Sequence, residues 1–151
     1  MSKKINRRDF IKATTAVGAA AAVMPKTLFS SPASKRVKLG IIGTGMRGQW
    51  VLWLAAKYPG VDITAICDID DGMIQSAIKI LKEAGKPEPH VYKAGDEDFR
   101  NLVKNEDLDG VYIATPWEWH HPMAIAAMKH GIHVGTEVPA ALTVKDCWDL
   151  V

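Results

Sequence analysis

The stretch that decides the fold is Val37-Lys38-Leu39-Gly40-Ile41-Ile42-Gly43-Thr44-Gly45-Met46-Arg47-Gly48. Apart from Lys38, its first half is an apolar run typical of a buried parallel strand, and its second half is a G-x-G-x-x-G turn that opens a helical pattern. In such a turn the first glycine permits the tight bend, the second lets backbone approach a pyrophosphate, and the third lets helix and strand pack closely. The stretch therefore predicts a strand, a phosphate-binding turn and a helix, in that order.

The rest of the chain alternates β-branched runs with longer helical patterns, which is typical of a parallel sheet covered by helices on both faces. The predicted strands are Val37–Ile42, Val61–Cys67, His90–Tyr92, Leu108–Ala114 and Ile132–Val134. The predicted helices cover 46–58 and 71–84, begin near Asp96 and near Pro122, and run from Thr143 to Val151. We therefore predict a Rossmann-type, doubly wound α/β domain over residues 36–151.

The last predicted helix reaches Val151 without a cap or a following strand. A cofactor-binding half usually meets a second domain across its cleft. We therefore expect this domain to be truncated at its C-terminal end, with a second α/β domain missing from this chain.

An acidic side chain stands where the ribose of a dinucleotide is expected. Asp68 follows Gly48 by twenty residues, at the end of the second predicted strand. A carboxylate there accepts hydrogen bonds from ribose hydroxyls and repels a 2′-phosphate, so the pattern predicts NAD rather than NADP. The amides of Met46 and Arg47, at the start of the first helix, are expected to bind the pyrophosphate.

Two further loops are expected at the same edge of the sheet, because ligands of doubly wound sheets lie across the carboxyl ends of the strands. They are Thr115-Pro116-Trp117-Glu118-Trp119-His120-His121 and Gly135–Pro139. Indole faces pack against adenine, nicotinamide or a sugar, but they also close loops onto a sheet. For Trp117 and Trp119, the sequence allows either contact with a ligand or packing of the loop onto the sheet. For His120, it supports a functional and a structural role equally.

The N-terminal region has the pattern of a twin-arginine export signal. Five basic side chains and one acid precede the uncharged, alanine-rich run Ala13–Met24, and Asn6–Lys12 matches the twin-arginine motif. The run is too short and too weakly apolar to make a stable membrane anchor. We predict a signal peptide over residues 1–35, export by the twin-arginine machinery, and a periplasmic location.

The distribution of charge and the two cysteines limit the kinds of partner and ligand that we expect the chain to bind. Residues 1–35 hold seven of the nineteen basic side chains and one of the seventeen acids, which leaves twelve basic against sixteen acidic side chains. No basic stripe remains to suggest nucleic acid as a partner. Cys67 and Cys147 form neither a metal-ligand spacing nor a disulfide framework, so both are expected in the core and no metal is predicted.

With these motifs the domain resembles the N-terminal half of the glucose-fructose oxidoreductase and inositol dehydrogenase (Gfo/Idh/MocA) family. That family carries a glycine-rich turn, an acid after the second strand, a Thr-Pro-x-x-x-His loop and a Glu-Lys-Pro loop. The corresponding residues here are Gly43–Gly48, Asp68, Thr115–His120 and Glu137-Val138-Pro139. The departure is Val138, where the family's lysine stands beside the nicotinamide and the substrate.

One branch keeps this departure. The stretches Trp117–His120 and 137–141, together with the export signal, are similar to glycoside hydrolase family 109. The resemblance implies an NAD-dependent α-N-acetylgalactosaminidase that cleaves a carbohydrate by transient oxidation, elimination, addition of water and reduction, an exception to the usual carboxylate pair. An NAD-dependent sugar or polyol oxidoreductase and a non-catalytic NAD-binding fragment remain as alternatives, and homo-oligomerisation is left open.

Motif and resemblance together nominate twelve cofactor-binding residues, and the catalytic residues are expected beyond residue 151. The twelve are Gly43, Thr44, Gly45, Met46, Arg47, Asp68, Trp117, Glu118, Trp119, His120, Glu137 and Val138.

Overall fold

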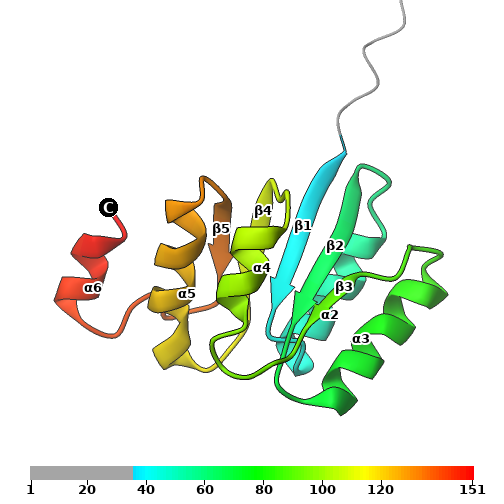
Figure 1. Cartoon of the computed structure of the whole chain (residues 1–151), viewed down its shortest axis with the longest axis horizontal. Coiled ribbons are helices and arrows are strands. Elements are labelled where there is room, and N and C mark those ends of the chain that lie inside the picture. Colours follow the sequence, from blue (N-terminus) through cyan, green and yellow to red (C-terminus); the bar gives the residue numbers. More distant parts are fainter. Residues whose placement is uncertain (1–35) are drawn as a thin grey trace, which may run out of the picture. The chain divides into compact units, whose positions relative to one another are not determined.

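The computed structural model describes residues 36–151, which form a parallel sheet with helices on both faces (Figure 1). In chain order the elements are β1 (Val37–Ile42), α2 (Met46–Ala56), β2 (Val61–Cys67), α3 (Asp71–Glu83), β3 (His90–Tyr92), α4 (Phe99–Asn105), β4 (Gly110–Ile113), α5 (Trp117–Lys129), β5 (His133–Thr136) and α6 (Val144–Asp149). The predicted export signal lies outside the described residues.

The five strands have the order β3-β2-β1-β4-β5 and all neighbours are parallel. This confirms the predicted doubly wound sheet. The chain leaves β1 toward β2 on one side and later returns to β4 on the other, so the order reverses between β1 and β4. A crevice opens at such a reversal, outside the carboxyl ends of the strands, and it is where ligands of this architecture bind.

The core consists of two apolar layers, one on each face of the sheet. On one face, α2 and α3 pack Leu52, Ile74 and Leu81 against β1 and β2. On the other face, α4 and α5 pack a second set, including Phe99, Leu102, Met123 and Ala127, against the opposite side of the same strands. Burial on both faces explains why these strands are near-continuous apolar runs rather than alternating ones.

The predicted loop from Thr115 to His121 is wrong in its second half, because α5 already begins at Trp117. Pro116 is the N-cap, and Pro122, expected near the helix start, lies well inside the helix. A proline there removes one backbone hydrogen bond. The buried side chains that α5 contributes offset this loss, so tertiary packing overrides the local signal.

Other boundaries also differ from the predicted ones. The helix expected from Asp96 begins at Phe99, after Asp98 has accepted a hydrogen bond from the amide of Ala94 (2.7 Å). Strand β4 is shorter than predicted, and β5 lies later, so that Glu137 directly follows the strand. The last helix, α6, ends at Asp149.

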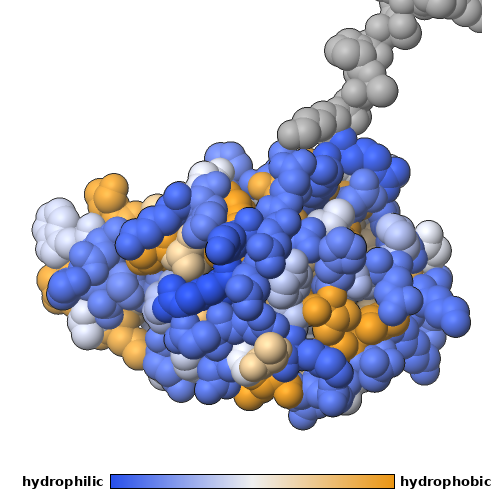
Figure 2. Space-filling view, viewed as in Figure 1, coloured by the Kyte–Doolittle hydropathy of each residue, from blue (hydrophilic) through white to orange (hydrophobic). Residues whose placement is uncertain are grey.

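Of the two cysteines expected in the core, only Cys67 is buried, whereas Cys147 is exposed on α6. Helix α6 buries none of its own residues. On the face shown in Figure 2 most of the surface is hydrophilic, with apolar residues at the end where α5 and α6 lie and in a second patch at the lower right. Leu142 and Val144, just before and at the start of α6, are exposed.

Candidate functional site

The glycine-rich turn between β1 and α2 has a separate physical reason for each glycine. Gly43 has φ +87°, a conformation that side chains with a Cβ rarely adopt. A Cβ on Gly48 would lie 1.9 Å from the carbonyl oxygen of Gly43, whereas a Cβ on Gly45 would meet nothing within 4 Å. The first and third glycines are therefore needed by the fold, and the space beside the second is free for a ligand.

Asp68 holds this turn from the end of β2. One carboxylate oxygen accepts hydrogen bonds from the amide of Thr44 (2.5 Å) and from its hydroxyl (3.0 Å). The other oxygen accepts from the amide of Asp70 (2.9 Å). The carboxylate thus sits at the mouth of the turn, and the first-turn amides of α2, which have no carbonyl partner within the helix, lie beside it.

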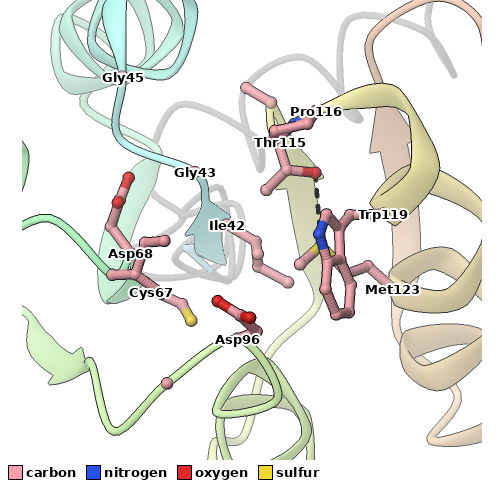
Figure 3. Close-up of a pocket in the computed structure, with 13 residues that line it drawn as sticks. Ile42, Gly43, Gly45, Cys67, Asp68, Asp96, Thr115, Pro116, Trp119 and Met123 are labelled. Carbon is pink, nitrogen blue, oxygen red and sulfur yellow. Dashed lines mark hydrogen bonds between the residues drawn. The ribbon is translucent and has the colours of Figure 1, made fainter.

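A pocket opens at the carboxyl ends of β1, β2 and β4, in the crevice that the strand order predicts (Figure 3). Apolar side chains make most of its wall, and Asp68 and Asp96 are its two carboxylates. The lining residues are Ile42, Gly43, Gly45, Cys67, Asp68, Ile69, Gly95, Asp96, Ala114, Thr115, Pro116, Trp119 and Met123. Burial raises the pKa of the Cys67 thiol to about 12, so this wall residue is protonated at neutral pH and not a nucleophile.

A polar network ties the start of α2 to the end of β5. The Nε of Arg47 donates to Glu137 Oε1 (2.5 Å), and the hydroxyl of Tyr112 donates to the same oxygen (2.6 Å). These two donors hold the pKa of Glu137 below its ordinary value, and the bond to Glu137 raises that of Arg47. The Arg47 guanidinium also lies 4.6 Å from the ring centre of Trp50. Glu137 is thus ionised and held in place.

His120 is fully buried, and both ring nitrogens face main-chain carbonyl oxygens. Nδ1 lies 2.8 Å from the oxygen of Pro139, and Nε2 lies 2.9 Å from that of Thr115. It does not line the pocket. The geometry therefore places His120 behind the site, where it joins the segment after β5 to the turn after β4.

The other nominated residues lie in different surroundings. Thr44 is buried beneath the turn, and Trp119 lines the pocket with its ring edge-on to Phe99. Met46, Trp117, Glu118 and Val138 are exposed and do not line the pocket. Val138 is 81% exposed, next to a cis peptide bond that joins it to Pro139.

Sequence reasoning missed Ile69, Asp96, Tyr112 and Met123. Ile69 and Asp96 follow β2 and β3, so the rule that ligands lie at the carboxyl ends of strands could have nominated them. Tyr112 is inside β4, and Met123 is in the second turn of α5. Only the register of the sheet and the true start of α5 bring these two side chains to the site.

These features fit a dinucleotide. The free space beside Gly45, the unpaired amides of α2 and the carboxylate of Asp68 match a pyrophosphate and an unphosphorylated ribose. Fold and site together define an NAD-binding Rossmann domain. The chain belongs to the Gfo/Idh/MocA oxidoreductase family, whose NAD-binding Rossmann fold model matches residues 37–151.

A twin-arginine translocation signal model matches residues 4–24, which confirms the predicted signal sequence. Among the helices of residues 36–151, none is long and apolar enough to cross a membrane.

The chain is also similar to proteins that are named as glycosyl hydrolases. The chain is 50% identical over 119 residues to a glycosyl hydrolase family 109 protein of Saccharopolyspora erythraea, covering 79% of this chain and 26% of that protein. It is 42% identical over 164 residues to an alpha-N-acetylgalactosaminidase of Tannerella forsythia, covering 96% of this chain and 35% of that protein. The chain thus spans about a third or less of the length of these relatives.

Among solved structures, the chain is similar to a scyllo-inositol dehydrogenase of Lactobacillus casei with bound NAD(H) and scyllo-inositol. The TM-score is 0.65 at 27% identity, covering 77% of this chain and 32% of that chain. The expected fold and cofactor are confirmed by this likeness and by the family model.

Proposed function

We propose that this chain is the cofactor-binding part of an exported NAD-dependent glycosidase that acts on α-N-acetylgalactosaminides. The proposal rests on Val138, which stands where the resemblance places the lysine of the dehydrogenases. An exposed valine neither donates a hydrogen bond nor carries charge, so it cannot replace that lysine, and another residue must take the hydroxyl proton in either activity. The resemblance places the same departure from the lysine in glycoside hydrolase family 109. Relatives that are glycosyl hydrolases by name cover nearly the whole chain.

In this proposal the described residues bind and orient the cofactor. Residues 1–35 serve as the signal peptide, and residues 36–151 form the NAD-binding domain. The amides of Met46 and Arg47 bind the pyrophosphate, and Asp68 accepts from the ribose hydroxyls. Bound NAD supplies reversible hydride transfer with a sugar carbon. Because the hydride returns within each cycle, no external nicotinamide pool is needed, which suits a location outside the cytoplasm.

A second candidate function is an NAD-dependent sugar or polyol oxidoreductase. The family model describes oxidoreductases, and the similar solved structures include inositol dehydrogenases. The polypeptide that the gene encodes should release the aglycone of a chromogenic α-N-acetylgalactosaminide without net NADH. Steady growth of NADH absorbance with a free sugar or polyol would instead establish the oxidoreductase. Absence of both signals, with NAD bound, would contradict both enzymatic functions.

The cofactor part is tested on this chain by calorimetric titration. Asp68→Asn keeps an acceptor for the Thr44 amide but removes the charge, so it should admit NADP. Asp68→Ala should weaken NAD binding roughly 10- to 100-fold, since a hydrogen bond to a charged group contributes about 1.5–3 kcal/mol. Asp62→Asn changes a carboxylate on the same strand that pairs with Arg36, away from the pocket, and should leave both affinities unchanged. Equal NAD and NADP affinities in the parent would refute the assignment.

A further inference from the structure

Three side chains with metal-ligating atoms meet between α5 and α6. We infer that His121, Asp146 and Asp149 form a binding site for a divalent first-row transition metal ion of the Zn²⁺ or Mn²⁺ kind. His121 comes from the second turn of α5, and the two aspartates lie three positions apart on α6, so they share one face of that helix. None of the three lines the cofactor pocket. The site is therefore separate from the proposed function.

The contacts between His121 and the two aspartates are longer than direct hydrogen bonds. His121 Nδ1 lies 3.6 Å from an oxygen of Asp146, and Nε2 lies 3.5 Å from an oxygen of Asp149. Both separations exceed the usual hydrogen-bond range of about 2.7–3.2 Å. Ligand atoms bound at about 2.1 Å to one ion stand roughly 3 to 3.5 Å apart, and the separation of Nε2 from Asp149 is close to this length. Because the lone pairs of the two ring nitrogens diverge, one ion would be bound by Nε2 alone, and the carboxylate of Asp146 would reach it by rotating. One ligand atom from each residue lies within 4.8 Å of the other two, so small side-chain rotations complete the site.

A second observation comes from the histidine itself. His121 Nε2 is sealed from solvent and has no hydrogen-bond partner. A buried polar atom without a partner is costly, and an ion is one of the few explanations for it. This nitrogen lies beside the carboxylate of Asp149. The lone pair of a neutral imidazole can bind a metal ion at this position.

The types of ligand atom indicate which ions the site would bind. One imidazole and two carboxylates suit zinc, manganese and iron, whereas calcium prefers oxygen ligands throughout. Two carboxylates also balance the charge of a divalent cation. Lys145 pairs with the oxygen of Asp149 at 2.5 Å, but its side chain is 80% exposed. An exposed pair of this kind contributes little, so an ion can displace the ammonium group.

The ion would join α6 to the body of the domain. No residue of α6 is buried, so apolar packing alone holds this helix weakly. Metal binding should therefore raise the thermal stability of the chain, because a ligand that binds only the folded state stabilises it.

The test uses chelator-treated, tag-free protein carrying Cys147→Ser, since the exposed thiol on α6 would itself attract zinc. Calorimetric titration with Zn²⁺ and with Mn²⁺ should show one ion per chain for at least one of the two metals, together with a rise in melting temperature. His121→Gln and Asp149→Asn should each lower the affinity at least 100-fold. His130→Gln, a change at the end of α5, should leave it unchanged.

Melting in chelator shows whether each variant folds, and NAD titration of His121→Gln shows that the cofactor site is intact. X-ray absorption of the bound ion should show nitrogen and oxygen ligands with one imidazole. Failure of both metals to bind stoichiometrically would overturn the inference. Binding that survives His121→Gln in a folded protein would also overturn it. A protein that takes up one ion but not NAD would contradict only the proposed function.

Discussion

Asp68 serves the fold and the proposed cofactor site with the same carboxylate. One oxygen accepts from the amide of Thr44 in the glycine-rich turn, and the other accepts from the amide of Asp70 just after β2, so the strand end, the turn and the acid are fixed together. Its position is set by backbone contacts rather than by a flexible ion pair. A site built in this way is organised before the cofactor arrives.

A second carboxylate, Asp96, points into the pocket from the turn after β3 (Figure 3). An ionised carboxylate only accepts hydrogen bonds, and the exocyclic amine is the donor that adenine offers. We predict that Asp96→Ala weakens NAD binding about fivefold, as expected for roughly 1 kcal/mol at a partly exposed site. Binding of the hypoxanthine analogue of NAD, which lacks the amine, should not change.

The control for Asp96 is Glu97→Ala, which alters the neighbouring acid outside the pocket and should keep the parent affinity for NAD. Equal losses of NAD and of the hypoxanthine analogue in Asp96→Ala would exclude recognition of the amine.

At the scale of elements, two glycines of the turn between β1 and α2 are expected to have different roles. Gly48 is needed for the stability of the fold, and Gly45 for NAD binding. Gly48→Ala places a methyl group against the carbonyl of Gly43 and should destabilise the domain by about 3 kcal/mol or more. Gly45 has φ −63° and free space around its Cα, so Gly45→Ala should fold normally and lose NAD affinity. Chemical denaturation and calorimetry measure the two effects. A stable Gly48→Ala variant would show that helix and strand pack less closely than described.

The link between α2 and β5 should respond to acid. Tyr112 and Arg47 hold the pKa of folded Glu137 below its unfolded value, which is about 4.3. The stability that the ionised network contributes is therefore fully present above the unfolded pKa and is lost as pH falls through the folded pKa. We expect Glu137→Gln to be less stable than the parent at pH 7 and to lose less stability between pH 5 and pH 3. Parallel melting curves over this range would contradict the prediction.

At the scale of the whole molecule, a twin-arginine signal sequence precedes an NAD-binding domain. The twin-arginine route carries folded proteins, so the cofactor could be loaded before export. Arg7→Lys combined with Arg8→Lys should strand the precursor in the cytoplasm, because the route reads the arginine pair. Fractionation followed by immunoblotting measures the distribution. Normal periplasmic recovery of the double variant would argue against this route.

The sequence by itself determined the parallel α/β architecture, the glycine turn, the acid at position 68 and the export signal. These features depend on local patterns. The periodicity of apolar residues, the spacing of glycines and the sequence of charged residues can all be recognised within short stretches of the chain. Strand β3 matched its predicted bounds, and β1 and β2 did as well.

Only the tertiary structure decided where α5 begins, that His120 lies behind the pocket, and that Tyr112 and Met123 reach the site. Trp117–His121 looks like a loop because a proline follows it, yet packing of Met123 and Ala127 on the sheet extends the helix past that proline. The cluster of His121 with Asp146 and Asp149 joins residues about 25 positions apart, which no local spacing reveals. Such contacts depend on strand order and helix docking, and these are properties of the assembled sheet rather than of any segment.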